Sequence, residues 1–375
     1  MNIWPKKIST KRTLRWTFPA AIATLAIGSA TLPTTFAATN TNNSIPPTPK
    51  MLLNQALSSK VPPLSGTLQL NSHLGISSLL SSFGNGQNSS NSTLSLLSGS
   101  HNIGIWENGP KQFRIAIYSP LSEVDIIRNH SSLWLWNSKS LTATHASLAN
   151  KTALGHSHKN NKSMMPTTAL TNKLLTHLGS SATTKVLGPT QIAGQNAYTL
   201  SVSPNSSSSL ISSIQVGIDQ SNGMVLKVAV IPKGATAPAF SLGFSSISFA
   251  SPSNSIFSFT PPKNSNLKEL ASKPLAQKAS SNKTHFRSIS KNPLGLQILN
   301  KGFGTKVAAL PVASLPAKDL KMLNMIASHG QTVTGSFGTG KVITTSLINM
   351  LITPKYIFIG PVNTTTLETS AASKF

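Results

Sequence analysis

The chain has no cysteine and very few acids. None of its 375 residues is cysteine, which excludes a disulfide framework, a thiolate nucleophile and a lipid-modified N-terminal cysteine. Only seven residues are aspartate or glutamate. A serine triad needs a carboxylate to orient its histidine, and glycoside hydrolysis needs two carboxylates. Because there is no G-x-S-x-G segment either, the sequence predicts that the chain is not an enzyme.

Basic residues greatly outnumber the acids. Lysine and arginine total 32, the formal net charge is +25, and yet only 10% of the residues are charged. Serine, threonine and asparagine carry most of the surface polarity, as if acids had been removed. Carboxylates with reference pKa values of about 4 lose their charge in acidic media, whereas lysine and arginine keep theirs. The pattern predicts a basic protein of an acidophile, most stable below neutral pH.

The basic surplus also predicts the kind of surface that the protein meets. The lysines are scattered over loops and are not gathered with aromatic residues, so the pattern does not indicate nucleic-acid binding. Attraction to an anionic membrane surface or to wall polymers fits a diffuse positive charge better.

Residues 1–38 are typical of an export signal. Basic residues between Lys6 and Arg15 precede the apolar run "FPAAIATLAIGSATLP", and "TFAATN" supplies small residues for cleavage near Ala37 or Ala38. We therefore expect a secreted protein of the periplasm, the cell surface or the extracellular space. An uncleaved signal would instead leave a membrane anchor, and the sequence leaves this alternative open.

Two blocks of short strands follow, each preceded by a helical pattern. The first has a helix at 49–60 and strands at 65–76, 101–106, 112–118, 123–128, 133–138 and 141–148. The second has a helix ending near Gly179 and strands at 196–204, 211–219, 224–232, 239–250 and 256–262. Asn, Gly, Pro and Ser lie at most of the joins, which predicts antiparallel meanders.

The chain is predicted to divide into four parts. A signal peptide at 1–38 is followed by a strand-rich domain at 39–265. Residues 266–292 are basic and aperiodic, as expected of a linker. Residues 293–375 read as a small α+β extension, with a helix at 316–327.

Three segments resemble a phosphate-binding loop, a metal site and a catalytic carboxylate pair, but none is predicted to have that function. "GSFGTGKV" at 335–342 imitates a phosphate-binding loop, but Val342 stands where magnesium needs a hydroxyl. His145, His156 and His158 lack neighbouring carboxylates or thiols, so no metal site and no cofactor are expected. Glu123 and Asp125 share a strand face, where Asp125 is expected to point toward water or a lysine.

The segment "LWLW" at 133–136 is the strongest candidate for a binding surface. It places two of the five tryptophans of the chain on one strand, with apolar residues on both faces. Core packing explains such a strand, because aromatic side chains dominate cores. Lining of an apolar cavity explains it as well, and the sequence leaves both interpretations open.

The order of elements resembles the LolA-type lipoprotein carrier superfamily, which also includes RseB/MucB-like domains. The resemblance lies in "SGTLQL" (65–70), "IWENGPKQFRIAI" (105–117), "SSLWLWNSKSLTAT" (131–144), "QIAGQNAYTLSVSP" (191–204), "VGIDQSNGMVLKVAV" (216–230) and "FSFTPP" (257–262). It implies an α+β fold: an incomplete antiparallel β-barrel, or half-barrel, with helices closing its concave face.

The resemblance implies a carrier or sensor whose apolar cavity holds acyl chains of a lipid or lipoprotein. The residues expected to line this cavity are Leu68, Leu70, Trp106, Ile115, Ile117, Trp134, Trp136, Tyr198, Leu200, Val216, Leu226 and Val228. Two alternatives remain. One is an RseB-like envelope-stress regulator that binds a membrane-bound partner protein, and the other is a ligand-free structural protein of the cell surface.

Overall fold

The computed structural model describes residues 46–75, 98–148, 179, 181–270, 295–300 and 302–374. The predicted signal, the His156/His158 loop and most of the predicted helix before Gly179 lie outside these residues. The elements are α2 (Pro49–Ser58), β1 (Leu64–His73), β2 (Ser98–Glu107), β3 (Gln112–Ser119), β4 (Ser122–Asn129), β5 (Ser132–Asn137), β6 (Thr142–Ser147), β7 (Ala182–Ile192), β8 (Gln195–Pro204), β9 (Ile211–Asp219), β10 (Val225–Pro232), β11 (Phe240–Ser248), η4 (Asn254–Phe257), β12 (Asn266–Leu270), β13 (Gln297–Leu299), β14 (Val307–Pro311), η5 (Val312–Ser314), α5 (Ala317–Ser328), β15 (Gln331–Gly335), β16 (Gly338–Ile343), β17 (Asn349–Ile352), β18 (Tyr356–Gly360) and α6 (Thr364–Ala372).

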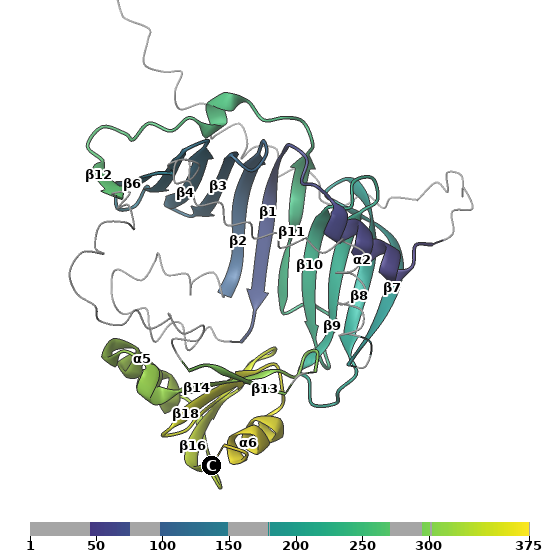
Figure 1. Cartoon of the computed structure of the whole chain (residues 1–375), viewed down its shortest axis with the longest axis vertical. Coiled ribbons are helices and arrows are strands. Elements are labelled where there is room, and N and C mark those ends of the chain that lie inside the picture. The colour runs from purple at the N-terminus through teal and green to yellow at the C-terminus, as the bar shows by residue number, and fades with distance from the viewer. Residues whose placement is uncertain are drawn as a thin grey trace, which may run out of the picture. The chain divides into compact units, whose positions relative to one another are not determined.

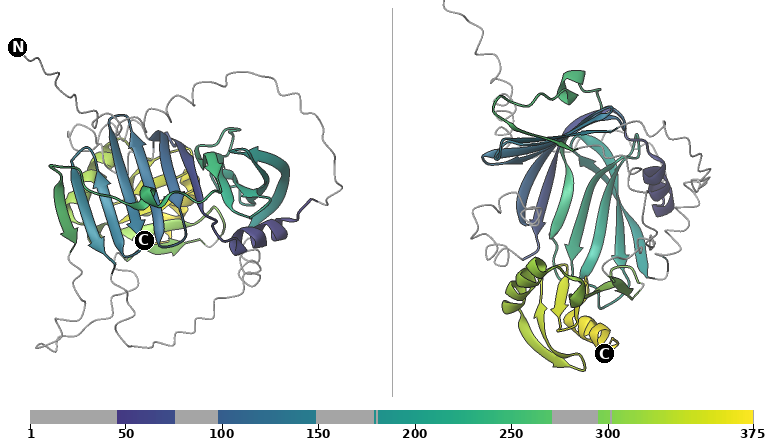
Figure 2. Two further views of the ribbon diagram at one scale, coloured as in Figure 1. Left: turned by 90° about the horizontal axis from the view of Figure 1, so that it is seen from above. Right: turned by 60° about the vertical axis from the view of Figure 1, so that its left-hand side comes forward.

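The first twelve strands form one large sheet in the order β12-β6-β5-β4-β3-β2-β1-β11-β10-β9-β8-β7. All neighbours are antiparallel except β12 and β6. The sheet is curved and open and does not close into a barrel (Figures 1 and 2). The predicted half-barrel and α+β class are therefore confirmed.

Helix α2 forms where the sequence pattern places it. The Thr48 hydroxyl accepts a hydrogen bond from the Met51 amide at 3.3 Å, and Pro49 occupies the first turn, as is common at helix starts. Leu52, only 1% exposed, packs against Leu200 and Ile218 of the sheet. One side of this short helix is thus held by the sheet core.

The connection from β11 to β12 differs from the sequence expectation. Residues 256–262 were expected to form a strand, but the segment begins with the 3₁₀ helix η4, which packs on β3 and β4. Beyond it, the five residues of β12 pair in parallel with β6. The first residues of the predicted linker are thus part of the large sheet.

The remaining strands form a six-stranded sheet in the order β13-β14-β18-β17-β16-β15. Helix α6 packs on β17 and β18, and Leu367 joins the core cluster of Phe358. Helix α5 packs on β16, and Leu323 joins the cluster of Ile357. Because successive strand residues point to opposite faces, the two helices cover opposite faces of this sheet.

Backbone hydrogen bonds join the two sheets within the compact unit Pro47–Phe375. The Leu210 amide donates to the Pro361 carbonyl at 2.8 Å, and the Asn363 amide donates to the Ser208 carbonyl at 2.9 Å. The Ser346 amide donates to the Leu74 carbonyl at 3.2 Å.

No helix among the described residues is long and apolar enough to cross a bilayer.

Candidate functional site

The cross-strand register places the predicted lining residues on opposite faces of the large sheet. Directly paired antiparallel residues share a face. Trp134 pairs with Ile127, Ile127 with Arg114, and Arg114 with Trp106. Trp136, two residues from Trp134, lies on the same side. This side of strands β2–β6, which holds all three tryptophans, is the tryptophan face.

The aliphatic side chains form the opposite surface, the aliphatic face. Its rows follow from the register: Leu68, Ile103, Ile117 and Val124; Ile105, Ile115, Ile126 and Leu135; and Leu70, Leu242, Val228, Val216 and Leu200. Tyr198 alternates in phase with Leu200 and shares this face. Eight of the twelve predicted lining residues lie here.

Leu226 belongs to neither set. It lies at the register shift between Val225 and Lys227 of β10. Its side chain is 1% exposed and packs in a core cluster with Leu64 and Ala197. A side chain this deeply enclosed by protein belongs to the hydrophobic core and does not line an open face.

The tryptophan face is filled by protein. Phe259, which follows η4, contacts both Trp134 and Trp136, with ring centroids 5.3 and 5.9 Å apart respectively. His145 stacks on Trp134 at 4.3 Å between centroids. Trp136 is 7% exposed and Phe257 of η4 only 1%. Residues 249–265, here called the covering segment, thus close this face over β3–β5.

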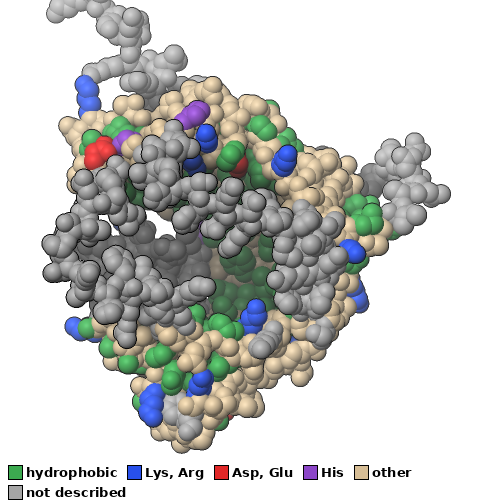
Figure 3. All heavy atoms as spheres, viewed as in Figure 1, with side chains coloured by type: hydrophobic (Ala, Val, Ile, Leu, Met, Phe, Trp, Pro, Cys, Tyr) green, Lys and Arg blue, Asp and Glu red, His purple; other side chains and the backbone are tan. Residues whose placement is uncertain are grey.

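The aliphatic face is only partly covered. Leu68, Ile115, Ile117, Val216 and Val228 are all half-buried, and Leu135 is 46% exposed. Helix α2 covers the end near β7 and β8, where Leu200 is buried beneath it. Seen from the side of α2, Figure 3 shows hydrophobic side chains on the floor of a hollow. Within the part of the chain that the structure describes, this face therefore presents a continuous apolar surface that is only partly covered.

A charge network lies beside the tryptophans. Arg114 donates to both carboxylate oxygens of Asp125, at 3.2 and 2.8 Å, and to Glu123 at 3.1 Å. Its guanidinium also lies 5.6 Å from the ring centroid of Trp106. Asp125 is only 2% exposed. It lies opposite Val124 and Ile126 as expected, but it is buried against an arginine and does not point to water or a lysine.

The surroundings shift several pKa values in this network. Burial, followed by repulsion from Asp125, raises the pKa of Glu123 despite the attraction of Arg114. Burial, together with the charge of Glu123, raises the pKa of Tyr118 to about 12. For Arg114, burial lowers the pKa, but the bond to Asp125 and the nearby carboxylates outweigh it and the net pKa is raised. The cluster therefore holds one arginine between two carboxylates of unequal burial.

His145 joins the last strand to the sheet. Its Nδ1 lies 2.9 Å from a carboxylate oxygen of Glu269 in β12, and its Nε2 lies 2.9 Å from the Ser132 hydroxyl. Within the described residues, no three His, Asp or Glu side chains gather as a metal site. In the segment 335–342, which resembles a phosphate-binding loop, Gly335 and Gly338 pair at the turn between β15 and β16. These residues make structural contacts.

Sequence reasoning missed one functional element of this arrangement, the covering segment. Its hydrophobic residues, such as Phe257 and Phe259, suggested another strand. The two prolines that follow, Pro261 and Pro262, were a signal against a paired strand, because proline cannot donate to a ladder.

The comparisons with known proteins give resemblances of structure. No family model and no curated protein matches the sequence. A chain of the Pseudomonas aeruginosa MucA/MucB complex is 14% identical with a TM-score of 0.41, covering 86% of this chain and 96% of that one. A LolA superfamily protein from Nitrosomonas europaea is 11% identical with a TM-score of 0.21, covering 57% and 98%. A putative outer membrane lipoprotein-sorting protein domain from Vibrio parahaemolyticus is 11% identical with a TM-score of 0.19, covering 54% and 92%.

Proposed function

We propose that this protein is an exported carrier or sensor that binds the acyl chain of a lipid or lipoprotein on the aliphatic face. The observation that carries the proposal is the continuous row of aliphatic side chains across the large sheet, most of them half-buried. The proposed lining is Leu68, Leu70, Ile115, Ile117, Tyr198, Leu200, Val216 and Val228. Trp106, Trp134 and Trp136 are left out because they lie on the opposite face.

The driving force would be removal of apolar surface from water. Each square ångström of apolar area that ligand and protein bury together contributes about 25 cal/mol. An acyl chain offers no hydrogen bonds, so the site needs apolar walls and few polar groups. Helix α2 covers one end of the face, and its movement would admit and release the chain.

The net charge of +25 supports delivery to or from an anionic membrane surface. Attraction by lipid head groups acts within about one Debye length and weakens with salt. The basic surface would bring the protein to the membrane, and the aliphatic face would hold the chain.

The test is native mass spectrometry on protein purified without detergent, with organic extraction of any bound species. Val216→Asp places a charge on the aliphatic face, and Gln215→Asp places the same charge on the opposite face of the same strand. We expect a co-purifying acyl species with the wild type and with Gln215→Asp, and its loss with Val216→Asp in folded protein.

A wild-type protein that carries no lipid and takes up no added fatty acid would contradict the proposal. Capture of a membrane protein by such a lipid-free chain would support the regulatory alternative. Equal loss of lipid in both variants would show that the binding surface is not the aliphatic face.

A further inference from the structure

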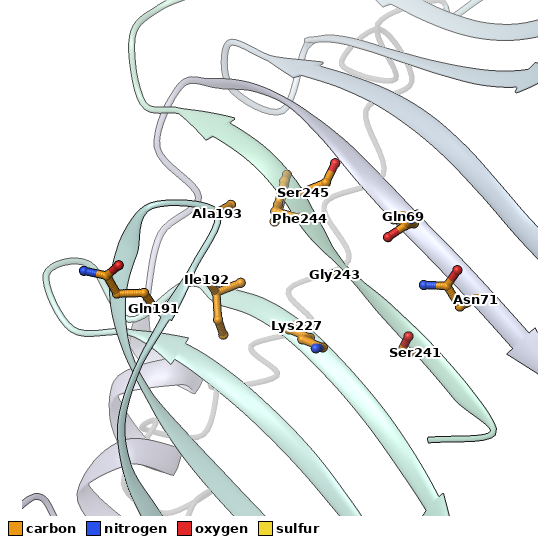
Figure 4. Close-up of a pocket in the computed structure, with 10 residues that line it drawn as sticks. All are labelled: Gln69, Asn71, Gln191, Ile192, Ala193, Lys227, Ser241, Gly243, Phe244 and Ser245. Atoms are coloured by element: carbon orange, nitrogen blue, oxygen red, sulfur yellow. The ribbon is translucent and has the colours of Figure 1, made fainter. Parts of the chain in front are cut away.

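A second hollow lies on the other side of the large sheet, over β1, β10 and β11. It has a volume of about 330 Å³. Its lining residues are Gln69, Asn71, Gln191, Ile192, Ala193, Lys227, Ser241, Gly243, Phe244 and Ser245. Figure 4 shows them, with β1 on one side and the end of β7 on the other. These residues form what is here called the amide pocket.

Two glycines create this space. A Cβ atom on Gly217 would lie 2.2 Å from Cδ1 of Ile192, and one on Gly243 would lie 2.8 Å from Cγ of Lys227. At either position a larger residue would push Ile192 or Lys227 out of its present place. The glycines therefore let the end of β7 approach the sheet and let the lysine stem lie flat across β11.

The register shows that this pocket is separate from the aliphatic face. Lys227 pairs with Gly243, and Gly243 with Gln69, whereas the neighbouring residue Val228 pairs with Leu242. Successive residues of a strand point to opposite sides. A ligand of the amide pocket would therefore not compete with a chain on the aliphatic face.

The chemistry of the lining is polar, with a single charge. Three amide side chains, Gln69, Asn71 and Gln191, each offer donors and an acceptor. Ser241 and Ser245 add hydroxyl groups, and no acid lines the pocket. The ammonium group of Lys227 makes no ion pair or hydrogen bond with the part of the chain that the structure describes. The pocket thus offers one cation surrounded by groups that both donate and accept.

We propose that the amide pocket binds a hexose-sized sugar that carries one acidic group, a uronate or a sugar phosphate. Sugar hydroxyls donate and accept, as amides and serines do, and the acidic group would pair with Lys227 in a charge-assisted bond. Ile192 contributes an apolar contact for the C–H face of a sugar ring. The volume is at the lower end for small-molecule pockets, which suits one sugar unit.

The experiment is a titration of the full chain, labelled at isoleucine methyl groups, with the Ile192 signal as the readout. The probes are sodium glucuronate, glucose 1-phosphate, glucose and sodium sulfate. We expect saturable shifts with glucuronate or glucose 1-phosphate, weaker binding of glucose, and no matching effect of sulfate. The response to the two acidic probes identifies the acidic group.

Two variants test the role of the charge. Lys227→Met keeps the stem and removes the ammonium group, and it should weaken binding of the acidic sugar about tenfold or more. Lys185 lies on β7, outside the pocket but on the same side of the sheet as Lys227. Lys185→Met removes the same charge there and should have no effect. Gln69→Ala should weaken binding of the acidic sugar and of glucose alike.

Three results would overturn the proposal. They are the absence of a saturable shift with either acidic sugar, equal binding of sulfate and glucuronate, and an equal loss of affinity in Lys185→Met and Lys227→Met. Because the pocket and the aliphatic face are on opposite sides of the sheet, failure here leaves lipid binding untouched.

Discussion

Over strands β2–β6, both faces of the large sheet carry large apolar side chains, but the two faces are completed differently. On the tryptophan face, the covering segment places Phe257 and Phe259 over the strands, and Trp136 and Ile127 are buried. On the aliphatic face, Ile115 and Ile117 of the adjacent strand stay half-buried. The difference shows that, over these strands, the tryptophans mark the closed side and the smaller aliphatic residues mark the open side.

Removing the main anchor of the covering segment should give the largest effect. Phe257→Ala deletes a ring that is 1% exposed, and such truncations cost about 3–5 kcal/mol. Urea unfolding measures the loss. Leu121→Ala is the control, because Leu121 is 98% exposed and should change stability by less than about 0.5 kcal/mol. Equal effects would mean that the covering segment does not close the tryptophan face.

Two isoleucines of adjacent strands compare the faces directly. Ile127→Ala, on the tryptophan face where Ile127 is 1% exposed, should destabilise the protein by about 3 kcal/mol. Ile117→Ala, on the aliphatic face, should cost only about 1 kcal/mol because the side chain is half-buried without ligand. Calorimetry with and without added fatty acid provides the measurement. Similar values for both variants would remove the distinction between a closed and an open face.

The charge network should contribute somewhat less than the aromatic core. Arg114→Met leaves Asp125 buried without its partner and should cost about 2–3 kcal/mol, since water still reaches the partly exposed site. Adding Asp125→Leu should restore most of this stability, because two apolar groups replace the pair. A double variant as unstable as the single one would show that the arginine acts mainly through its packing on Trp106.

The smallest effect concerns pH. The pKa of Glu123 is raised by burial and by Asp125, so its contribution to stability is present below its unfolded pKa and is lost as pH rises through the folded value. Glu123→Gln should therefore gain stability relative to the wild type as pH rises from acid to neutral.

Urea unfolding at acidic and at neutral pH measures the difference in stability between Glu123→Gln and the wild type. Glu107→Gln should shift in the same direction, because burial raises the pKa of Glu107 as well. A Glu123→Gln variant that loses stability at neutral pH would mean that attraction by Arg114 outweighs burial. The expected direction agrees with the adaptation to acid that the composition predicts.

Local sequence patterns predicted the strands whose contacts are local. Alternating residues and turn signals indicated β2–β6 and the β9–β10 hairpin, and Pro49 marked the start of α2. Strand β7 was missed because Gly188 and Pro189 interrupt its pattern, at a register shift against β8. Helix α6 was missed because threonine is a weak helix former, although Asn363 caps it through the Thr366 amide.

The candidate site could be predicted only in part. Alternation correctly places Trp134 with Trp136, and Ile115 with Ile117. It cannot tell which face a distant segment covers, and here Phe259 comes from far along the chain. The amide pocket depends on a row of paired residues that crosses β9, β10, β11 and β1 and includes Gly217 and Gly243. These residues are far apart in the sequence, so no local pattern reveals the row.

Single cysteines test the central claim most directly, because the chain has no native thiol. Ile117→Cys places a thiol on the aliphatic face, and Tyr118→Cys places one on the opposite face of the same strand, where Tyr118 is 40% exposed. The rate of thiol modification is measured with and without a saturating fatty acid. We predict that the fatty acid slows modification at position 117 and leaves position 118 unchanged. No protection at position 117, or equal protection at both, would contradict acyl-chain binding on the aliphatic face.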